Sequence, residues 1–265
     1  MDLKLKDKVA IITGSSSGIG RATAIEFAKT GCNVVLTGRR ADALESTKAE
    51  CVAAGLNEKQ VLLVPGDVTN EAYREKLINE TKTTFGRIDA LVNNAGLNVF
   101  KPLEQQTMED FDSVFNLNVR SVVALTRLAM PHLVETKGAV INVSSIWSTQ
   151  MVPHVTYYCM TKAAIDAFTK CFAYAYADKG VRVNAVNPGP VKTDILSGAD
   201  ADKIWNAIEQ TQPNGRVADP SEIGRLIVFL ASPDSSFIMG STYIADGGMG
   251  LTNATSINGK AANMF

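Results

Sequence analysis

The sequence predicts an α/β fold, a doubly wound parallel sheet in a single domain with helices on both of its faces. Two observations predict this fold. Short apolar runs alternate with longer amphipathic runs along most of the chain, a pattern typical of the β-α units that build parallel sheets. A glycine-rich turn, Gly14–Gly20, also lies between the first apolar run and the first helical run, where such folds bind phosphate groups.

Length and composition fit one large domain and exclude several function classes. The chain has 265 residues, 46% of them hydrophobic, which is enough to bury a full core. The net charge is −1 and both signs are spread along the chain, so no basic block favours nucleic acid or a membrane surface. No apolar run approaches the roughly 20 residues that span a bilayer, and the charged start does not resemble a signal peptide. These features predict no nucleic-acid partner and no membrane span.

The cysteines and histidines give no sign of a disulfide framework or a metal site. Cys32, Cys51, Cys159 and Cys171 lack the spacing of a metal-binding or redox pair, and the two histidines join no acidic cluster. We interpret the cysteines as reduced thiols, which predicts a cytoplasmic protein.

Seven apolar runs are the predicted strands. They are Val9–Thr13, Asn33–Thr37, Val61–Val64, Ala90–Val92, Ala139–Val143, Val181–Val186 and Thr242–Ala245. The predicted helices are Arg21–Thr30, Ala41–Gly55, Glu71–Phe85, a helix from Thr107 to about Pro131, Thr156–Lys179 and a helix that begins at Asp219-Pro220. Thr69 is a candidate cap for the third helix, and Pro220 suits a first helical turn. The domain is predicted to cover residues 1–251, and the polar residues 252–265 form a tail.

Unusual residues follow the predicted strands. In a parallel sheet the carboxyl ends of the strands meet at one edge, where ligands bind. The residues in question are Gly14–Gly20, Arg39, Asp67, Asn93–Gly96, Ser145 and Pro188-Gly189. The sequence therefore predicts a ligand site at this edge.

A tyrosine and a lysine four residues apart begin the Ala-rich helix Thr156–Lys179. Tyr158 and Lys162 lie one above the other on one helix face. An ammonium beside a phenol lowers the phenol's pKa, so the spacing predicts that Tyr158 can act as a general acid or base. The alternative is a surface ion-pair stripe formed by Lys162, Asp166 and Lys170.

With these motifs the chain resembles the short-chain dehydrogenase/reductase family, in its single-domain branch, from about Lys6 to Gly248. The motifs are Thr13-Gly14-x-x-x-Gly18-Ile19-Gly20, Asn93-Asn94-Ala95-Gly96, Ser145, Tyr158-x-x-x-Lys162 and Pro188-Gly189 with Thr193. The resemblance implies a seven-stranded Rossmann sheet and hydride transfer between a nicotinamide cofactor and a carbonyl or carbinol carbon of a small molecule.

The resemblance also implies roles for individual residues. Tyr158 would be the acid or base, Lys162 would lower its pKa and hold the ribose, and Ser145, rather than Ser144, would bind the substrate oxygen. Asn118, rather than Asn116, would orient a water beside Lys162. The implied cofactor-binding residues are Gly14, Ser16, Ser17, Gly18, Ile19, Gly20, Arg39, Asp67, Val68, Asn94, Ala95, Gly96, Tyr158, Lys162, Pro188, Gly189, Val191 and Thr193.

The substrate pocket is predicted to be largely apolar. The resemblance places a substrate lid at about Asp194–Pro213, and a second loop joins Ser145 to Tyr158. Their apolar residues suit a steroid, terpenoid, retinoid, fatty acyl or aromatic carbonyl, although about half of them could instead pack the lid itself. A 3-oxoacyl-carrier-protein reductase is an alternative, and a redox-inactive NADP-binding regulatory protein is another. An epimerase would need a longer chain.

Two further expectations concern the cofactor and the assembly. Gly38 stands where an NAD-binding site carries an acid, and Arg39 follows it, so we expect NADP(H). Arg40 is expected only to start the next helix in solvent. The helix Thr156–Lys179 is apolar around most of its circumference, which predicts a second buried face and a homotetramer.

Overall fold

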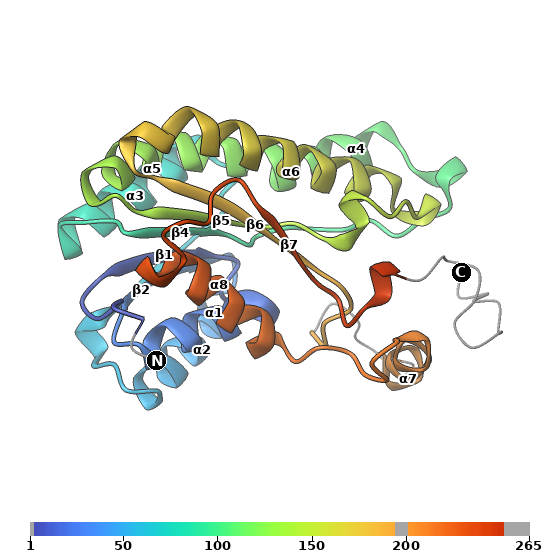
Figure 1. Cartoon of the computed structure of the whole chain (residues 1–265), viewed down its shortest axis with the longest axis horizontal. Coiled ribbons are helices and arrows are strands. Elements are labelled where there is room, and N and C mark those ends of the chain that lie inside the picture. The colour runs from blue at the N-terminus through green and yellow to red at the C-terminus, as the bar shows by residue number, and fades with distance from the viewer. Residues whose placement is uncertain (1–2, 194–200, 252–265) are drawn as a thin grey trace.

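The computed structural model describes residues 3–193 and 201–251, which form a seven-stranded parallel sheet covered by helices on both faces (Figure 1). The strand order is β3-β2-β1-β4-β5-β6-β7, with every neighbouring pair parallel. The strands are β1 (Val9–Thr13), β2 (Asn33–Gly38), β3 (Val61–Pro65), β4 (Ala90–Asn93), β5 (Ala139–Val143), β6 (Arg182–Pro188) and β7 (Thr242–Ala245). The predicted fold class is confirmed.

The helices divide between the two faces of the sheet (Figure 1). One face carries α1 (Gly18–Lys29), α2 (Ala41–Ala53) and α8 (Pro220–Ala231); the other carries α3 (Glu71–Phe85), α4 (Met108–Phe115), α5 (Ser121–Thr136) and α6 (Thr156–Tyr176). A further helix, α7 (Ala201–Thr211), lies beyond the carboxyl end of the sheet. Each face has its own apolar core, one around Phe27 and Leu44 and the other around Leu77 and Leu125. The central strands are buried on both sides, which explains their continuous apolar sequence.

The predicted helix from Thr107 to Pro131 is interrupted and is longer than expected. A capping box between Thr107 and Asp110 starts α4, a π-helical turn at Asn116–Arg120 follows, and α5 then runs through Pro131 to Thr136. The expected end at Pro131 is wrong, because burial of Leu133 in the core continues the helix past the missing N–H of the proline.

The cap of α3 also differs from the prediction. The side chain of Asn70 accepts the Tyr73 N–H, whereas both the N–H and the hydroxyl of Thr69 donate to Asp67 Oδ1 at 2.8 Å. Thr69 therefore fixes the turn after β3 instead of the helix start. At α8 the predicted start is confirmed, with Asp219 and Glu222 forming a capping box and Pro220 in the first turn.

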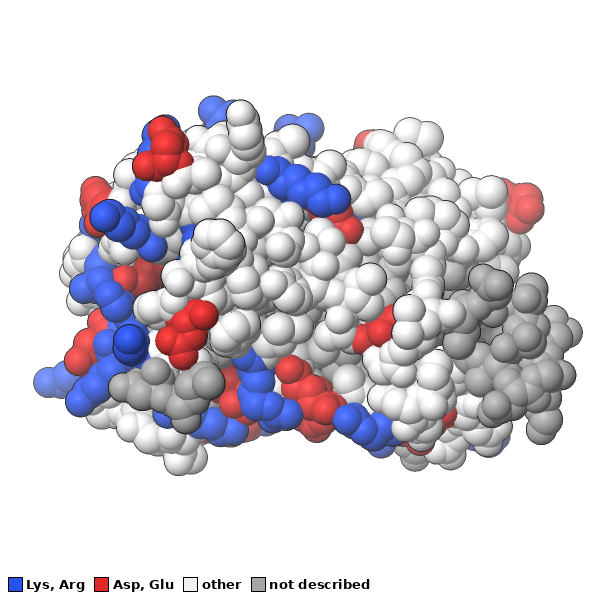
Figure 2. Space-filling model, viewed as in Figure 1, with Lys and Arg blue, Asp and Glu red and all other residues white. Residues whose placement is uncertain are grey.

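Within the described ranges, no helix combines the length and the apolar character needed to cross a membrane. On the face shown in Figure 2, positive and negative side chains lie interspersed, mainly over the left and lower parts of the molecule.

Candidate active site

The glycine turn after β1 leaves the start of α1 open. Gly18 has a φ of +54°, and a Cβ on it would come within 3.1 Å of Thr193 Cγ2. A Cβ on Gly20 would overlap the carbonyl oxygen of Gly14. Ser17, the N-cap of α1, makes no side-chain cap hydrogen bond, so the first N–H groups of this helix are not capped by it. A bare helix N-terminus reached through glycines suits a diphosphate.

The segment after β4 is tied to this turn through Thr13. The Oγ1 of Thr13 accepts the N–H groups of Asn94 (2.9 Å) and Ala95 (3.0 Å), and Asn94 Nδ2 donates to the Thr13 carbonyl at 2.8 Å. The next residue, Gly96, lies so that a Cβ would be 3.3 Å from Asn118 Oδ1 and 3.8 Å from Lys162 Nζ. The segment therefore connects the glycine turn with the candidate catalytic residues.

Ser145 and Tyr158 lie together where β5 ends and α6 begins. The phenol of Tyr158 is in hydrogen-bond contact with the Ser145 side chain, and the Trp147 N–H donates to Ser145 Oγ at 3.1 Å. The Trp147 indole meets the Tyr158 ring edge-on at 6.0 Å between centroids. Ser144 instead donates its hydroxyl to the Lys162 carbonyl at 3.2 Å. The geometry thus brings Ser145 to Tyr158, as expected, and leaves Ser144 in a structural contact.

The neighbouring Tyr157 points elsewhere. Its ring packs edge-on against Phe111 of α4, with 5.3 Å between centroids. Of the two adjacent tyrosines, Tyr158 is therefore the one that faces Ser145 and Lys162.

The expected lowering of the Tyr158 pKa by Lys162 is not what this arrangement produces. Burial raises the pKa of Tyr158 to about 12, against an opposing effect of the Ser145 hydrogen bond. Burial also lowers the pKa of Lys162 to about 8, and the charge of Asp166 partly offsets this. Lys162 Nζ lies 5.2 Å from the centre of the Tyr158 ring and donates to the Val143 carbonyl at 2.7 Å. Loss of water around both groups therefore outweighs their mutual effect.

Asn118 lies in the π-helical turn between α4 and α5 and is buried. Its Oδ1 accepts the Leu97 N–H at 2.9 Å, and its Nδ2 donates to the Leu97 carbonyl at 2.9 Å and to Thr161 Oγ1 at 3.2 Å. Single π-helical turns inside α-helices are frequent at functional sites. Asn116 instead lines a groove on the outer side of α5. The structure places Asn118, rather than Asn116, beside the catalytic candidates.

A family model described as Enoyl-(Acyl carrier protein) reductase matches residues 14–250. Hydroxynaphthalene reductase of Aspergillus fumigatus is 37% identical over 254 residues, covering 91% of this chain and 92% of the relative. The chain belongs to the short-chain dehydrogenase/reductase family.

Other relatives agree with this assignment. Meso-2,3-butanediol dehydrogenase of Serratia marcescens is 34% identical, in an alignment that covers 93% of this chain and 96% of the dehydrogenase. A short-chain dehydrogenase/reductase of Caenorhabditis elegans, solved with cofactor, superposes with a TM-score of 0.89 at 39% identity, over 95% of this chain and 98% of that one. L-sorbose reductase of Gluconobacter frateurii, solved in complex with NADPH and L-sorbose, gives a TM-score of 0.88 at 33% identity. This superposition covers 96% of this chain and 100% of the reductase. The family fold binds a nicotinamide cofactor, and the glycine turn fits its diphosphate.

The residues predicted to bind the adenine end of the cofactor lie at the ends of β2 and β3. Partial burial raises the pKa of Asp67, but the hydrogen bonds from Thr69 and then the charge of Arg39 bring it below its usual value. The carbonyl of the neighbouring Val68 accepts from Arg74 Nη1 at 2.9 Å. The charge of Arg39 therefore acts on the Asp67-Val68 turn, which is predicted to contact the adenine.

Gly38 and Arg40 border the glycine turn. A Cβ at Gly38 would lie 3.3 Å from Ser16 Oγ, and Arg40 Nη2 donates to the same oxygen at 3.5 Å. Arg40 starts α2, as expected, but its exposed side chain also reaches the glycine turn, which the sequence did not indicate.

The predicted nicotinamide end is formed by the segment after β6. The Gly189 N–H donates to the Ala245 carbonyl of β7 at 3.0 Å, and Val191 forms an isolated parallel bridge with Ala218. These contacts hold the Pro188–Thr193 segment against the sheet and bring Thr193 to Gly18.

Two neighbouring segments flank this end. His154 stacks on Phe100 at 5.4 Å between ring centroids, and Met151 is exposed. Helix α7 lies within the expected lid and buries Trp205, whereas residues 194–200 lie outside the described part of the chain. The lid therefore stays a prediction.

A buried polar network beneath the site was not anticipated. Asn93 Nδ2 donates to Thr126 Oγ1 (3.0 Å) and to Asn142 Oδ1 (2.8 Å), and Asn142 Nδ2 donates to Thr169 Oγ1 (2.9 Å). It joins β4 and β5 to α5 and α6. The signal in the sequence is Asn142, a polar residue inside an otherwise apolar buried strand.

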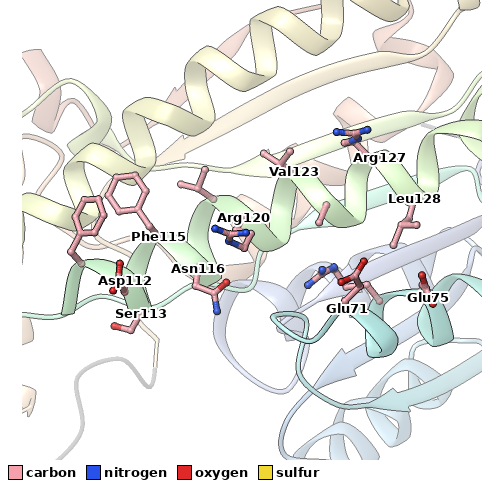
Figure 3. A pocket seen from close by; sticks show the side chains of 14 residues that line it. Glu71, Glu75, Asp112, Ser113, Phe115, Asn116, Arg120, Val123, Arg127 and Leu128 are labelled. Atoms are coloured by element: carbon pink, nitrogen blue, oxygen red, sulfur yellow. The ribbon is translucent and has the colours of Figure 1, made fainter. Parts of the chain in front are cut away.

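A groove of about 1070 Å³ lies away from this site, between α3, α4 and α5 (Figure 3). Glu71 and Glu75 of α3 line one side, and Arg120 of the π-helical turn and Arg127 of α5 line the other. The groove is on the outer surface of the helix layer, so its large volume does not identify it as the active site. No group of acids, histidines and cysteines within 3–193 and 201–251 is arranged to hold a metal ion.

Proposed function

We propose that the protein is an NADP(H)-dependent oxidoreductase that interconverts a carbonyl and a secondary alcohol on a largely apolar small molecule. The observation that carries this proposal is the convergence of Ser145, Tyr158, Lys162 and Asn118 at the sheet edge that also bears the glycine turn. A cofactor diphosphate on that turn and a substrate oxygen at Ser145 and Tyr158 would use the same edge.

Each residue has a role that follows from its contacts. Ser145 and Tyr158 would both hydrogen-bond the substrate oxygen, and Tyr158 would give it a proton on reduction or remove one on oxidation. The high pKa of the phenol, about 12, keeps that proton in place until the oxygen gains negative charge. Lys162 would hold the ribose hydroxyls and supply positive charge next to the phenol. When bound, the nicotinamide supplies or accepts the hydride.

Asn118 would fix the wall of the site beside Lys162. Its side chain accepts the Leu97 N–H and donates to the Leu97 carbonyl and to Thr161, so in this structure it orients the Leu97 backbone. The segment Asn94–Gly96 would then form the wall beside the nicotinamide, with Thr193, Val191 and the Pro188-Gly189 backbone opposite.

The proposed substrate class rests on the aromatic and apolar side chains near Tyr158. Trp147 packs on the Tyr158 ring, and Phe100 and Met151 are exposed. Such a surface favours flat or cyclic apolar carbonyls of the steroid, terpenoid, retinoid or aromatic type. The name of the hydroxynaphthalene reductase relative points to the same aromatic class.

The preference for NADP(H) is proposed from Gly38, Arg39 and Arg40. An acid is missing at the end of β2, and two guanidinium groups stand beside the place where a 2′-phosphate would lie. The sorbose reductase neighbour was solved with NADPH, which supports this choice.

The test is a substrate panel followed by NADPH absorbance at 340 nm. The panel should hold aromatic and alicyclic ketones, a steroid ketone, butanedione, L-sorbose and a 3-oxoacyl thioester, each with NADPH and with NADH. We expect turnover of cyclic apolar ketones with NADPH. Fastest reduction of the thioester would instead favour a 3-oxoacyl-carrier-protein reductase, and binding of NADPH without turnover of any carbonyl would favour a regulatory protein.

We also propose a homotetramer in the cytoplasm. Phe168 and Phe172 of α6 pack together at 4.2 Å between centroids, while Cys171 and Tyr174 next to them are exposed. The groove of Figure 3 adds acids and arginines on the same helix layer, a mixture that suits contact between identical surfaces. The four cysteines are free thiols, as in a reducing compartment. A monomer mass by light scattering would overturn the tetramer.

A further inference from the structure

Beneath Ser145 and Lys162 lies a pair of polar side chains to which the proposed reaction gives no role. Asp166 is one turn after Lys162 on α6, and Asn187 lies near the end of β6. Asn187 Nδ2 donates to Asp166 Oδ2 at 2.9 Å, and the same nitrogen lies 3.1 Å from the Ser145 carbonyl oxygen and 3.0 Å from Ser148 Oγ. Asn187 is 2% exposed, so these contacts are shielded from water. The pair thus connects the backbone of Ser145 to a carboxylate.

The same carboxylate is the acid that acts on Lys162. Near Lys162, α6 presents the titratable groups Tyr158 and Asp166, and the π-helical turn presents the uncharged amide of Asn118. Burial lowers the pKa of Lys162 to about 8, and Asp166 is the one charge that raises it within the described residues. The Lys162 ammonium, whose Nζ donates to the Val143 carbonyl, therefore depends on Asp166 for its compensating charge.

Two buried oxygens of this pair have no donor. Asp166 Oδ1 and Asn187 Oδ1 accept no hydrogen bond from the described residues. An unsatisfied buried acceptor destabilises the fold, and such groups are concentrated at functional sites. Packing alone would favour an apolar residue at either position, so the pair calls for a role in the reaction.

We propose that Asp166 and Asn187 are positioning residues: the Asp166 carboxylate keeps Lys162 protonated near neutral pH, and the Asn187 amide holds the Ser145 backbone so that its hydroxyl stays against Tyr158. This proposal deepens the proposed function and rests on it. Asp166 acts on Lys162 through its charge, and Asn187 acts on Ser145 through its hydrogen bond.

The charge role is tested without turnover, by NMR of protein labelled with ¹³Cε-lysine and titrated with pH. The Lys162 signal is identified as the one missing in Lys162→Met. The wild-type signal should titrate near the value of about 8. Asp166→Asn, which keeps an acceptor for Asn187, should lower this pKa by about one unit. Asp166→Glu should restore it, and Asp178→Asn, the same charge change at an exposed position after α6, should leave it unchanged.

A Lys162 pKa that does not move in Asp166→Asn would overturn the charge role. If that variant does not fold, Asp166→Ser removes the same charge with a smaller side chain and serves in its place. Because no substrate is needed, this experiment remains decisive even if no carbonyl is reduced by the wild-type protein, an outcome that would count against the proposed function alone.

The hydrogen-bond role is tested with Asn187→Ala and Asn187→Ser, using the best ketone of the panel. We expect kcat to fall at least about tenfold in Asn187→Ala, with KM for NADPH within about twofold and with the Lys162 pKa nearly unchanged. In Asp166→Asn the alkaline limb of the kcat profile should move to lower pH together with the Lys162 pKa. An unchanged kcat in Asn187→Ala, or a pH profile that does not follow Lys162, would overturn the positioning of Ser145 or the coupling to Lys162, respectively.

Discussion

The ammonium of Lys162 donates a hydrogen bond of 2.7 Å to the carbonyl oxygen of Val143, the last residue of β5. The bond anchors a buried lysine at the carboxyl edge of the sheet, on the same helix as Tyr158. A buried ammonium destabilises the fold unless it is well paired, and its one acidic neighbour, Asp166, offsets only part of that cost. The buried charge that the proposed role of Lys162 requires thus lowers the stability of the folded protein.

Because burying the Lys162 ammonium costs stability, we predict that Lys162→Met stabilises the protein most at neutral pH. The folded pKa of Lys162 is about 8, below the ordinary 10.5, so between these values the unfolded chain binds the extra proton. The free energy of unfolding of the wild type should therefore rise with pH by about 1.4 kcal/mol per unit in this window, and that rise should be lost in Lys162→Met. The advantage of the variant should be largest below pH 8 and smaller by up to about 3 kcal/mol near pH 10.5.

Urea unfolding at several pH values from 7 to 10 measures this difference. Lys170→Met is the matched control, because Lys170 is exposed on the same helix and should show no such dependence. An equal effect of Lys162→Met at pH 7 and pH 10 would contradict the assignment of a buried, depressed lysine.

Tyr158→Phe should remove the acid or base while keeping the ring. The phenyl group retains the edge-on contact with Trp147, so we expect kcat to fall by about 100- to 10,000-fold with the Kd of NADPH changed less than about twofold. Steady-state kinetics and NADPH fluorescence titration measure the two quantities. Tyr157→Phe is the control and should be nearly silent, since its ring faces Phe111. Retention of most activity by Tyr158→Phe would rule out the proposed proton donor.

Arg182 predicts a stability effect far from the site. This buried arginine starts β6, and its guanidinium donates to the end of α8 and the turn after it, with distances from 2.7 to 3.3 Å. The acceptors are the carbonyls of Leu230, Ala231, Ser232 and Ser235 and the Ser235 hydroxyl. Arg182→Met should lower the free energy of unfolding by about 3 kcal/mol, because several carbonyls lose a charged donor.

Chemical denaturation and NADPH binding separate this effect from function. Arg225→Met is the matched control, because Arg225 is exposed and, among the described residues, donates a single hydrogen bond, to Ser221 Oγ at 3.0 Å. Cofactor affinity should be unchanged in Arg182→Met, since the start of β6 lies at the opposite end of the strand from Pro188. If the midpoint of Arg182→Met matched that of Arg225→Met, the capping role would be wrong.

The sequence alone predicted the strands and the edge that carries the site, because strands buried on both faces must be apolar throughout. All five residues of β1 and of β5 are buried, and each strand was recognised with its observed bounds. Helical spacing predicts that Tyr158 and Lys162 lie together, and the family resemblance adds Ser145 to them. The contact between Asp166 and Asn187 could not be predicted from the sequence. The two residues are 21 positions apart and meet only once α6 packs on β6.

Other features depended on quantities that a sequence does not contain. The π-helical turn at Asn116–Arg120 is a single turn with i→i+5 hydrogen bonds, too short for a residue pattern to distinguish it from an α-helix. The direction of the shift in the Tyr158 pKa depends on how much water reaches the phenol, and the four-residue spacing to Lys162 does not reveal the burial of the phenol. Proline usually ends helices, so the sequence predicts a helix end near Pro131, but the burial of Leu133 outweighs this preference.

The last prediction concerns the choice between NADPH and NADH. An aspartate at Gly38 would place its Cβ about 3.3 Å from Ser16 Oγ, at the mouth of the glycine turn, where it would repel a 2′-phosphate and accept from ribose hydroxyls. Arg39 acts on Asp67 with its charge and can hold the phosphate, a contact worth about 1.5–3 kcal/mol. The wild type should therefore prefer NADPH by roughly one to two orders of magnitude.

Gly38→Asp combined with Arg39→Ile should reverse this preference, because the anchor is removed and repulsion is added. Arg39→Ile alone should weaken NADPH binding and leave NADH nearly unchanged. Arg40→Ile is the matched control for the loss of a nearby charge; its 3.5 Å contact with Ser16 predicts a smaller loss than Arg39→Ile gives. Isothermal calorimetry with both cofactors measures all four proteins. If the wild type binds NADH as tightly as NADPH, the role proposed for Arg39 is wrong, and if Arg40→Ile loses more NADPH affinity than Arg39→Ile, the phosphate is held chiefly by the second arginine.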